Sequence, residues 1–167
     1  WHRHFADSGQ LWRFRPPNAR NWLDIGSGAG FPGLVLAIIG AGTGATHHCL
    51  IESDARKAAF LREVARATGI TVDILCMRIE NSETRAKVKS VDCLTARALA
   101  PLPRLLEMSA PYFTSATLGL FLKGKDAAAE VEQAAQVWQF DCELKPSMTD
   151  ADARIVLLNA LKPKREG

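Results

Sequence analysis

The sequence lacks any long run of apolar residues. Its longest, residues 34–39, has six of them, whereas a membrane-spanning helix needs about 20. Apolar residues make up 47% of the 167 positions and charged residues 23%, which is typical of a soluble globular protein rather than a disordered one. We therefore predict a single globular domain over residues 1–167 with no membrane partner.

Cysteine is scarce, and its spacing carries no metal-binding or redox pattern. Each cysteine lies in a short apolar run, and none forms a Cys-x-x-Cys pair: Cys49, Cys76, Cys93 and Cys142. We expect buried strand thiols in a reducing cytosol, and hence a cytoplasmic protein. The neighbouring His47 and His48 would point to opposite faces of a strand and could not easily converge on one ion, so no metal site is predicted.

Neither sign of charge dominates the chain. The formal net charge is +3, from 21 Lys and Arg against 18 Asp and Glu. This balance is compatible with a nucleic-acid partner, but many cytosolic enzymes share it, and it decides little alone.

Short apolar runs alternate with amphipathic stretches along the chain. We predict helices at the start (1–11), at 32–39, from a Ser53 cap to 68 with Gly69 closing it, at 102–110, and from Asp126 through Trp138. Strands are predicted at 22–25, 46–51, 72–77, 91–95, 117–122, 142–144 and 154–161.

This alternation predicts a doubly wound, Rossmann-like α/β fold with a mostly parallel, seven-stranded sheet covered on both faces. The last two strands have no helix between them, so they should form an antiparallel hairpin with a turn near 150–152. In such a sheet, ligands bind beyond the carboxyl ends of the strands, where the strand order reverses.

A glycine-rich turn follows the first predicted strand and opens a helix. Asp24 precedes Gly26, Gly28 and Gly30 at alternate positions, and glycines there allow a tight turn and close approach of a ligand. Residues 28–33 also match the dinucleotide fingerprint G-x-G-x-x-G. Glu52 ends the second strand and would hold ribose hydroxyls with either ligand.

Two features favour S-adenosylmethionine over a dinucleotide. The Asp24 carboxylate can hold the ammonium group of a methionine moiety but would repel a pyrophosphate, and Gly26 starts the turn earlier than the fingerprint requires. The rival interpretation, an NAD(P)-dependent oxidoreductase, lacks a Tyr-x-x-x-Lys proton-donor set, because the single tyrosine, Tyr112, has Ala116 four residues on.

The sequence resembles the GidB (RsmG) family, whose members methylate N7 of a guanine in bacterial 16S ribosomal RNA. The resemblance covers nearly the whole chain and rests on stretches in the family's order: 3–8, 24–33, 52–62, 78–80, 96–98 and 122–125. The family carries a helical segment before Arg3-His4, of which 1–18 would be the remnant. Since the chain opens with Trp1, we expect it to be a fragment or processed form.

The resemblance implies a set of site residues. It implies S-adenosylmethionine as the cofactor, with Gly26, Phe31 and Arg97 beside it and Ile79 and Glu80 around the adenine. It further implies a monomer acting on 16S rRNA within the small ribosomal subunit, and class I methyltransferase architecture.

Transfer of a methyl group to guanine N7 needs no general base, because N7 has a lone pair and no proton. Catalysis would come from alignment of the two reactants. We assign Arg97 and Lys123 to the target nucleotide, and Arg56 and Lys57 to the RNA backbone. His4 and Asp7, which share a helix face, are assigned to RNA contacts. Other readings are a non-catalytic ribosome-binding assembly factor, which would need no cofactor loop, and a small-molecule methyltransferase, which the basic helix after Ser53 disfavours.

Overall fold

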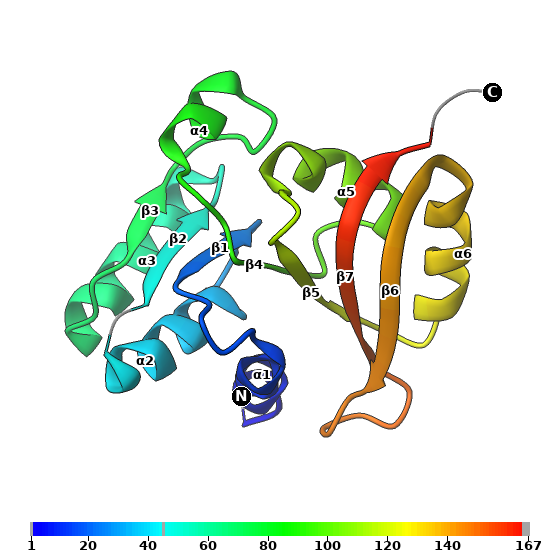
Figure 1. The fold of residues 1–167 in the computed structure, drawn as a ribbon. Helices are drawn as coiled ribbons and strands as arrows, with labels where there is room; N and C mark the ends of the chain where they lie inside the picture. Colours follow the sequence, from blue (N-terminus) through cyan, green and yellow to red (C-terminus); the bar gives the residue numbers. More distant parts are fainter. Residues whose placement is uncertain (1, 45, 165–167) are drawn as a thin grey trace.

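One seven-stranded sheet runs through the protein. The computed structural model describes residues 2–44 and 46–164, and the sheet order is β3-β2-β1-β4-β5-β7-β6 (Figure 1). The first five strands in this order are parallel, and β7 runs antiparallel to both β5 and β6. The predicted doubly wound α/β fold with its C-terminal hairpin is confirmed. The strands are β1 Asn21–Ile25, β2 His47–Ile51, β3 Asp73–Leu75, β4 Cys93–Arg97, β5 Leu118–Lys123, β6 Trp138–Pro146 and β7 Arg154–Pro163.

Helices cover both faces of this sheet. The side of α2 and α3 also receives the short N-terminal elements, whereas α5 and α6 pack together on the other side. None of the described helices is long and apolar enough to cross a membrane. The helices are α1 His2–Gly9, η1 Gln10–Phe14, α2 Gly33–Thr43, α3 Ala55–Thr68, α4 Ser82–Lys87, α5 Leu102–Ser109, η2 Ala110–Tyr112 and α6 Ala127–Val137.

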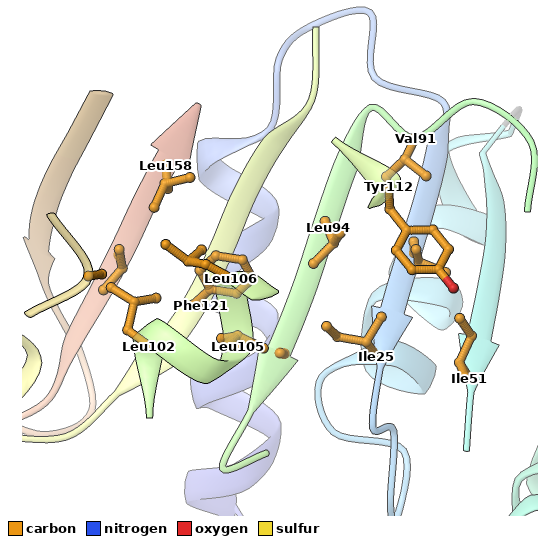
Figure 2. Close-up of a cluster of buried hydrophobic side chains, with 14 of the residues drawn as sticks. Ile25, Ile51, Val91, Leu94, Leu102, Leu105, Leu106, Tyr112, Phe121 and Leu158 are labelled. Atoms are coloured by element: carbon orange, nitrogen blue, oxygen red, sulfur yellow. The ribbon is translucent and has the colours of Figure 1, made fainter. Parts of the chain in front are cut away.

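The larger core cluster lies between the sheet and α5. Figure 2 shows Ile25, Leu94 and Phe121 on neighbouring strands, facing Leu105 and Leu106 of α5. Alternate residues of β1 and β4 point to the opposite face, so each strand contributes to two cores. Burial on both faces explains why these strands read as short apolar runs.

Some predicted boundaries are wrong for local reasons. The cap of α3 is Asp54, whose Oδ1 accepts from the N–H groups of Arg56 and Lys57, and not Ser53. Gly69 closes that helix in the left-handed region, as predicted. Trp138 begins β6 instead of ending α6. Strand β6 is longer than 142–144, because its mostly exposed residues hide the apolar pattern. Helix α4, with the polar sequence SETRAK, gave no periodic signal.

The cysteine prediction is half right. Cys49 and Cys93 are buried, and burial raises the pKa of each thiol to about 12. Cys76 and Cys142 are exposed, contrary to expectation, because Cys76 follows the three-residue β3 and Cys142 lies on the edge strand β6, where most residues are exposed. His47 and His48 do face opposite sides of β2, one exposed and the other buried.

Candidate active site

A cavity of about 400 Å³ opens at the carboxyl ends of β1, β2 and β4. The strand order reverses beside β1, which is the switch point at which doubly wound sheets bind ligands. Six of the residues predicted to bind the cofactor line this cavity: Gly26, Gly28, Glu52, Ile79, Glu80 and Arg97. Lys57, which was predicted to bind RNA, lines it as well.

The turn after β1 is fixed by Glu52 and by crowding. Glu52 Oε2 accepts a hydrogen bond from the Gly28 N–H at 2.8 Å, and its Oε1 accepts from the Asp54 N–H at 2.8 Å. Gly26 has a φ of 65°, and a Cβ there would lie 2.5 Å from a Leu99 methyl carbon. The backbone conformation at position 26 therefore favours glycine, and any side chain there would also push the Leu99 side chain aside.

Asp24 lies beneath this cavity rather than in its lining. Its Oδ1 accepts from the Thr95 hydroxyl at 2.6 Å, while Oδ2 is buried with no hydrogen-bond partner among the described residues. Burial, the largest cause, raises the pKa of Asp24 to about 6. A Cβ on Gly33 would approach Oδ2 to 2.6 Å, so the third glycine of the fingerprint packs α2 against β1.

The wall opposite the glycine turn comes from the segment after β3. The Tyr112 hydroxyl donates to the Ile79 carbonyl oxygen at 2.7 Å, which ties this wall to η2 and the core. Glu80 is 3.5 Å from Arg104 of α5. The structure thus gives Tyr112 a positioning contact that the sequence did not reveal.

Gly30 and Phe31 lie elsewhere. They line an apolar hollow of about 120 Å³ between α1, α2 and α3. The Phe31 ring packs edge-on against Phe5, with centroids 5.2 Å apart, and the Arg97 guanidinium carbon lies 5.3 Å from its centroid. Of the predicted cofactor residues, Asp24, Gly30 and Phe31 are therefore absent from the described lining of the first cavity.

A second cavity of about 500 Å³ adjoins the first. Arg97, Ala98 and Leu99, which directly follow one another at the end of β4, line both cavities. Ala98 has a φ of 50°, a left-handed conformation that costs a non-glycine residue about 1–2 kcal/mol. The shared wall is thus a strained turn, of the kind that collects at functional sites.

Each basic side chain that lines the second cavity forms an ion pair with an acidic one. Lys123 Nζ is 2.8 Å from Glu130 Oε2, and the nearest Arg97–Asp7 atoms are 3.8 Å apart. The third pair joins Arg3 and Asp150. All six side chains line the cavity, which is therefore polar without a net excess of positive charge.

Lys123 is engaged within the fold. Its side chain is 9% exposed, and Nζ also donates to the Ala100 carbonyl oxygen at 2.6 Å. Glu130 Oε2 in turn accepts from the Leu102 N–H at 2.6 Å. The Lys123–Glu130 pair consequently fastens the turn that separates the cavities, and Glu130 is a site residue that its place on a predicted helix did not reveal.

The predicted RNA contacts are spread over two regions. Arg56 is exposed at the start of α3, whereas Lys57 beside it faces the first cavity. His4 and Asp7 lie on one face of α1, as predicted, and both contact Arg97. Lys57 and Asp7 therefore line the cavities, and His4 contacts Arg97 at their shared wall. Arg56 lies outside the lining of both cavities.

The family model described as rRNA small subunit methyltransferase G (GidB) matches residues 1–156. The chain belongs to the GidB family. Ribosomal RNA small subunit methyltransferase G of Methylorubrum populi is 52% identical over 161 residues, covering 96% of this GidB chain and 75% of that protein. The corresponding protein of Parvibaculum lavamentivorans is 44% identical, with 96% and 70% covered.

Solved structures show the same fold as this GidB chain. A ribosomal protein L11 methylase from Lactobacillus delbrueckii subsp. bulgaricus superposes with a TM-score of 0.69 at 18% identity, covering 99% of this chain and 81% of that one. An MtNAS mutant in complex with S-adenosylmethionine gives 0.65 at 18% identity, with 90% and 58% covered. The resemblance noted in the sequence and the class I methyltransferase fold are confirmed, and the family match favours a methyltransferase over an oxidoreductase.

Proposed function

We propose that this methyltransferase transfers a methyl group from S-adenosylmethionine to N7 of a guanine in 16S rRNA of the small ribosomal subunit, in the cytoplasm. The observation that carries this proposal is a pair of adjoining cavities that share Arg97, Ala98 and Leu99. We assign the cofactor to the first cavity and the target guanosine to the second.

The residues of the first cavity fit S-adenosylmethionine. Asp24 lies outside the lining, so its buried Oδ2, which has no hydrogen-bond partner among the described residues, can serve an ammonium group only through water. Glu52 lies at the tip of β2, where a carboxylate accepts from ribose hydroxyls. The Gly28 N–H, which a dinucleotide site would offer to pyrophosphate, is already bonded to Glu52. S-adenosylmethionine supplies an electrophilic methyl group on a sulfonium centre when bound.

The second cavity fits a guanine that becomes positively charged. Methylation at N7 places a positive charge on the base, and unpaired cations nearby would oppose it. The ion pairs of Arg97, Lys123 and Arg3 with carboxylates remove that opposition. No side chain has to remove a proton, so the work of these residues is to hold the base in line with the methyl donor.

The test of this proposal is labelled methyl transfer from S-adenosylmethionine to naked 16S rRNA, to small subunits and to whole ribosomes. We expect label in at least one of these RNAs. An assembly factor or an oxidoreductase would give none, and NADH binding without S-adenosylmethionine binding would favour the oxidoreductase.

Arg97→Ala should lower methyl transfer by about 100-fold, in the range seen when one preorganised electrostatic group is lost. The thermal midpoint should change little, since the Arg97 side chain lies at the surface of the cavities. Arg66→Ala is the matched control, because Arg66 is 75% exposed at the far end of α3. Equal turnover of Arg97→Ala and the control would remove Arg97 from the site.

A further inference from the structure

The Arg97 guanidinium is held from three sides although it lies at a cavity wall. Its Nη1 is 3.0 Å from His4 Nδ1 and 3.8 Å from Asp7 Oδ2. Its flat face lies over the Phe31 ring, 5.3 Å from the centroid. These contacts leave the side chain only 24% exposed.

We propose that His4 and Asp7 are positioning residues that act through Arg97, instead of contacts for the RNA backbone. The inference rests on the proposed function, in which Arg97 holds the target nucleotide. It reassigns the pair that the sequence placed with the RNA.

The hydrogen-bond chemistry determines the state of His4. An arginine guanidinium only donates, so His4 must accept through Nδ1 and carry its ring proton on Nε2. Both polar contacts engage Nη1. The Nε and Nη2 groups of Arg97 have no partner among the described residues, and they remain for guanine O6 or a phosphate oxygen.

Asp7 is unsuited to direct contact with RNA. Its carboxylate would repel a phosphate, its side chain is 16% exposed, and its Oδ1 already accepts from the Thr149 hydroxyl. Beside Arg97 the same charge holds a cation in place. The chemistry of Asp7 therefore favours the positioning role.

Helix α1 is itself anchored to a distant part of the chain. The Gln10 side chain donates to Ser147 Oγ at 3.1 Å and accepts from the Met148 N–H at 2.9 Å. Arg3 pairs with Asp150. The turn between β6 and β7 is thus attached to α1, and α1 carries the two residues that contact Arg97. Figure 1 shows α1 on the same side of the molecule as this turn.

A double-mutant cycle tests the proposal. His4→Ala alone should lower kcat/KM by about tenfold, within the range of coupling between contacting residues. In an Arg97→Ala background the same change should have less than about a twofold effect, because its only route of action is gone. The cycle is repeated on RNA affinity without cofactor, measured by filter binding, so that a readout other than turnover is available.

Two variants refine the test. His4→Asn keeps an acceptor two bonds beyond Cβ, so it should recover most of the loss of His4→Ala. Asp7→Asn keeps the Thr149 contact but loses the charge, and its effect should also vanish without Arg97. The control is His47→Ala. His47 is an exposed histidine at the start of β2, where it pairs with Asp73.

Effects of His4 and Arg97 that simply add would overturn the positioning role and restore a separate RNA contact. Failure of the unaltered protein to methylate any RNA would instead overturn the proposed function. Should His4→Ala fail to fold, a cycle that combines Asp7→Asn with Arg97→Ala decides the same question.

Discussion

Asp24 and His48 are buried ionisable side chains whose pKa values move in opposite directions. Burial raises the pKa of Asp24 from 3.8 to about 6 and lowers that of His48 from 6.5 to about 4. In both cases the fold favours the neutral form. Each difference corresponds to roughly 3 kcal/mol between the two protonation states.

Asp24→Asn should stabilise the protein at pH 7.5 while weakening its affinity for S-adenosylmethionine. The folded carboxyl titrates above the unfolded one, so its ionisation costs stability as pH rises from about 3.8 through 6. The variant should gain up to about 3 kcal/mol at pH 7.5 and nothing near pH 3.5. Urea unfolding at both pH values, with calorimetry of cofactor binding, measures this. Unchanged cofactor affinity would separate Asp24 from the ligand.

His48→Phe should show the opposite dependence on pH. His48 is depressed in the folded state, so its contribution is present above pH 6.5 and is lost as pH falls through about 4. Phe keeps the stacking on Trp22, whose ring centroid lies 5.6 Å away. The variant should gain up to about 3 kcal/mol on the unaltered protein between pH 7.5 and 4, measured by urea unfolding. A constant difference across that range would contradict the burial argument.

At the scale of elements, the turn from β1 into α2 depends on a fit between Gly26 and Leu99. Gly26 directly follows β1 and Leu99 lies two residues after the neighbouring β4, and both line the first cavity. A side chain at position 26 would both strain the backbone and displace Leu99 from the wall between the cavities.

Gly26→Ala should reduce affinity for S-adenosylmethionine by about tenfold or more, equivalent to ~1.4 kcal/mol. The φ of 65° alone costs an alanine about 1–2 kcal/mol, and its Cβ would collide with Leu99. Gly42→Ala is the matched control. Gly42 lies in α2, and a Cβ added there would have no atom within 4 Å, so the free energy of unfolding should rise by up to about 1 kcal/mol. Equal calorimetric affinities of the two variants for S-adenosylmethionine would show that the Gly26 turn does not contribute to cofactor binding.

The elements of the fold could largely be predicted from the sequence, because their signals are local. Each of these signals spans only a few residues. They are the alternating apolar runs, Gly69 after α3, and the absence of a helical pattern between the last two strands. Helix α4 and most of β6 escaped prediction, since neither buries a continuous apolar face. The glycine turn and Glu52 directly follow β1 and β2, at the strand ends where the sequence placed them. Ile79 and Glu80, which the family resemblance implied, line the same cavity from a segment beyond β3.

At the scale of the whole molecule, the N-terminal segment meets the turn between β6 and β7 beside the second cavity. Gln10 contacts Ser147, Asp7 contacts Thr149 and Arg3 contacts Asp150, and each pair is more than 130 residues apart in the sequence. No local sequence pattern connects the residues of these pairs, so their contacts could not be predicted from the sequence. The charge balance of the second cavity could not be predicted for the same reason. Each of its basic side chains pairs with an acidic residue to which no sequence motif connects it.

In the proposed function, the guanine in the second cavity receives the methyl group at N7. The most direct measurement is chemical cleavage at N7-methylated guanines in 16S rRNA, after incubation of small subunits with the protein and S-adenosylmethionine. We expect a new cleavage at one guanine, absent when Arg97→Ala replaces the unaltered protein. Methyl incorporation without N7-specific cleavage, or with cleavage scattered over many guanines, would contradict the account.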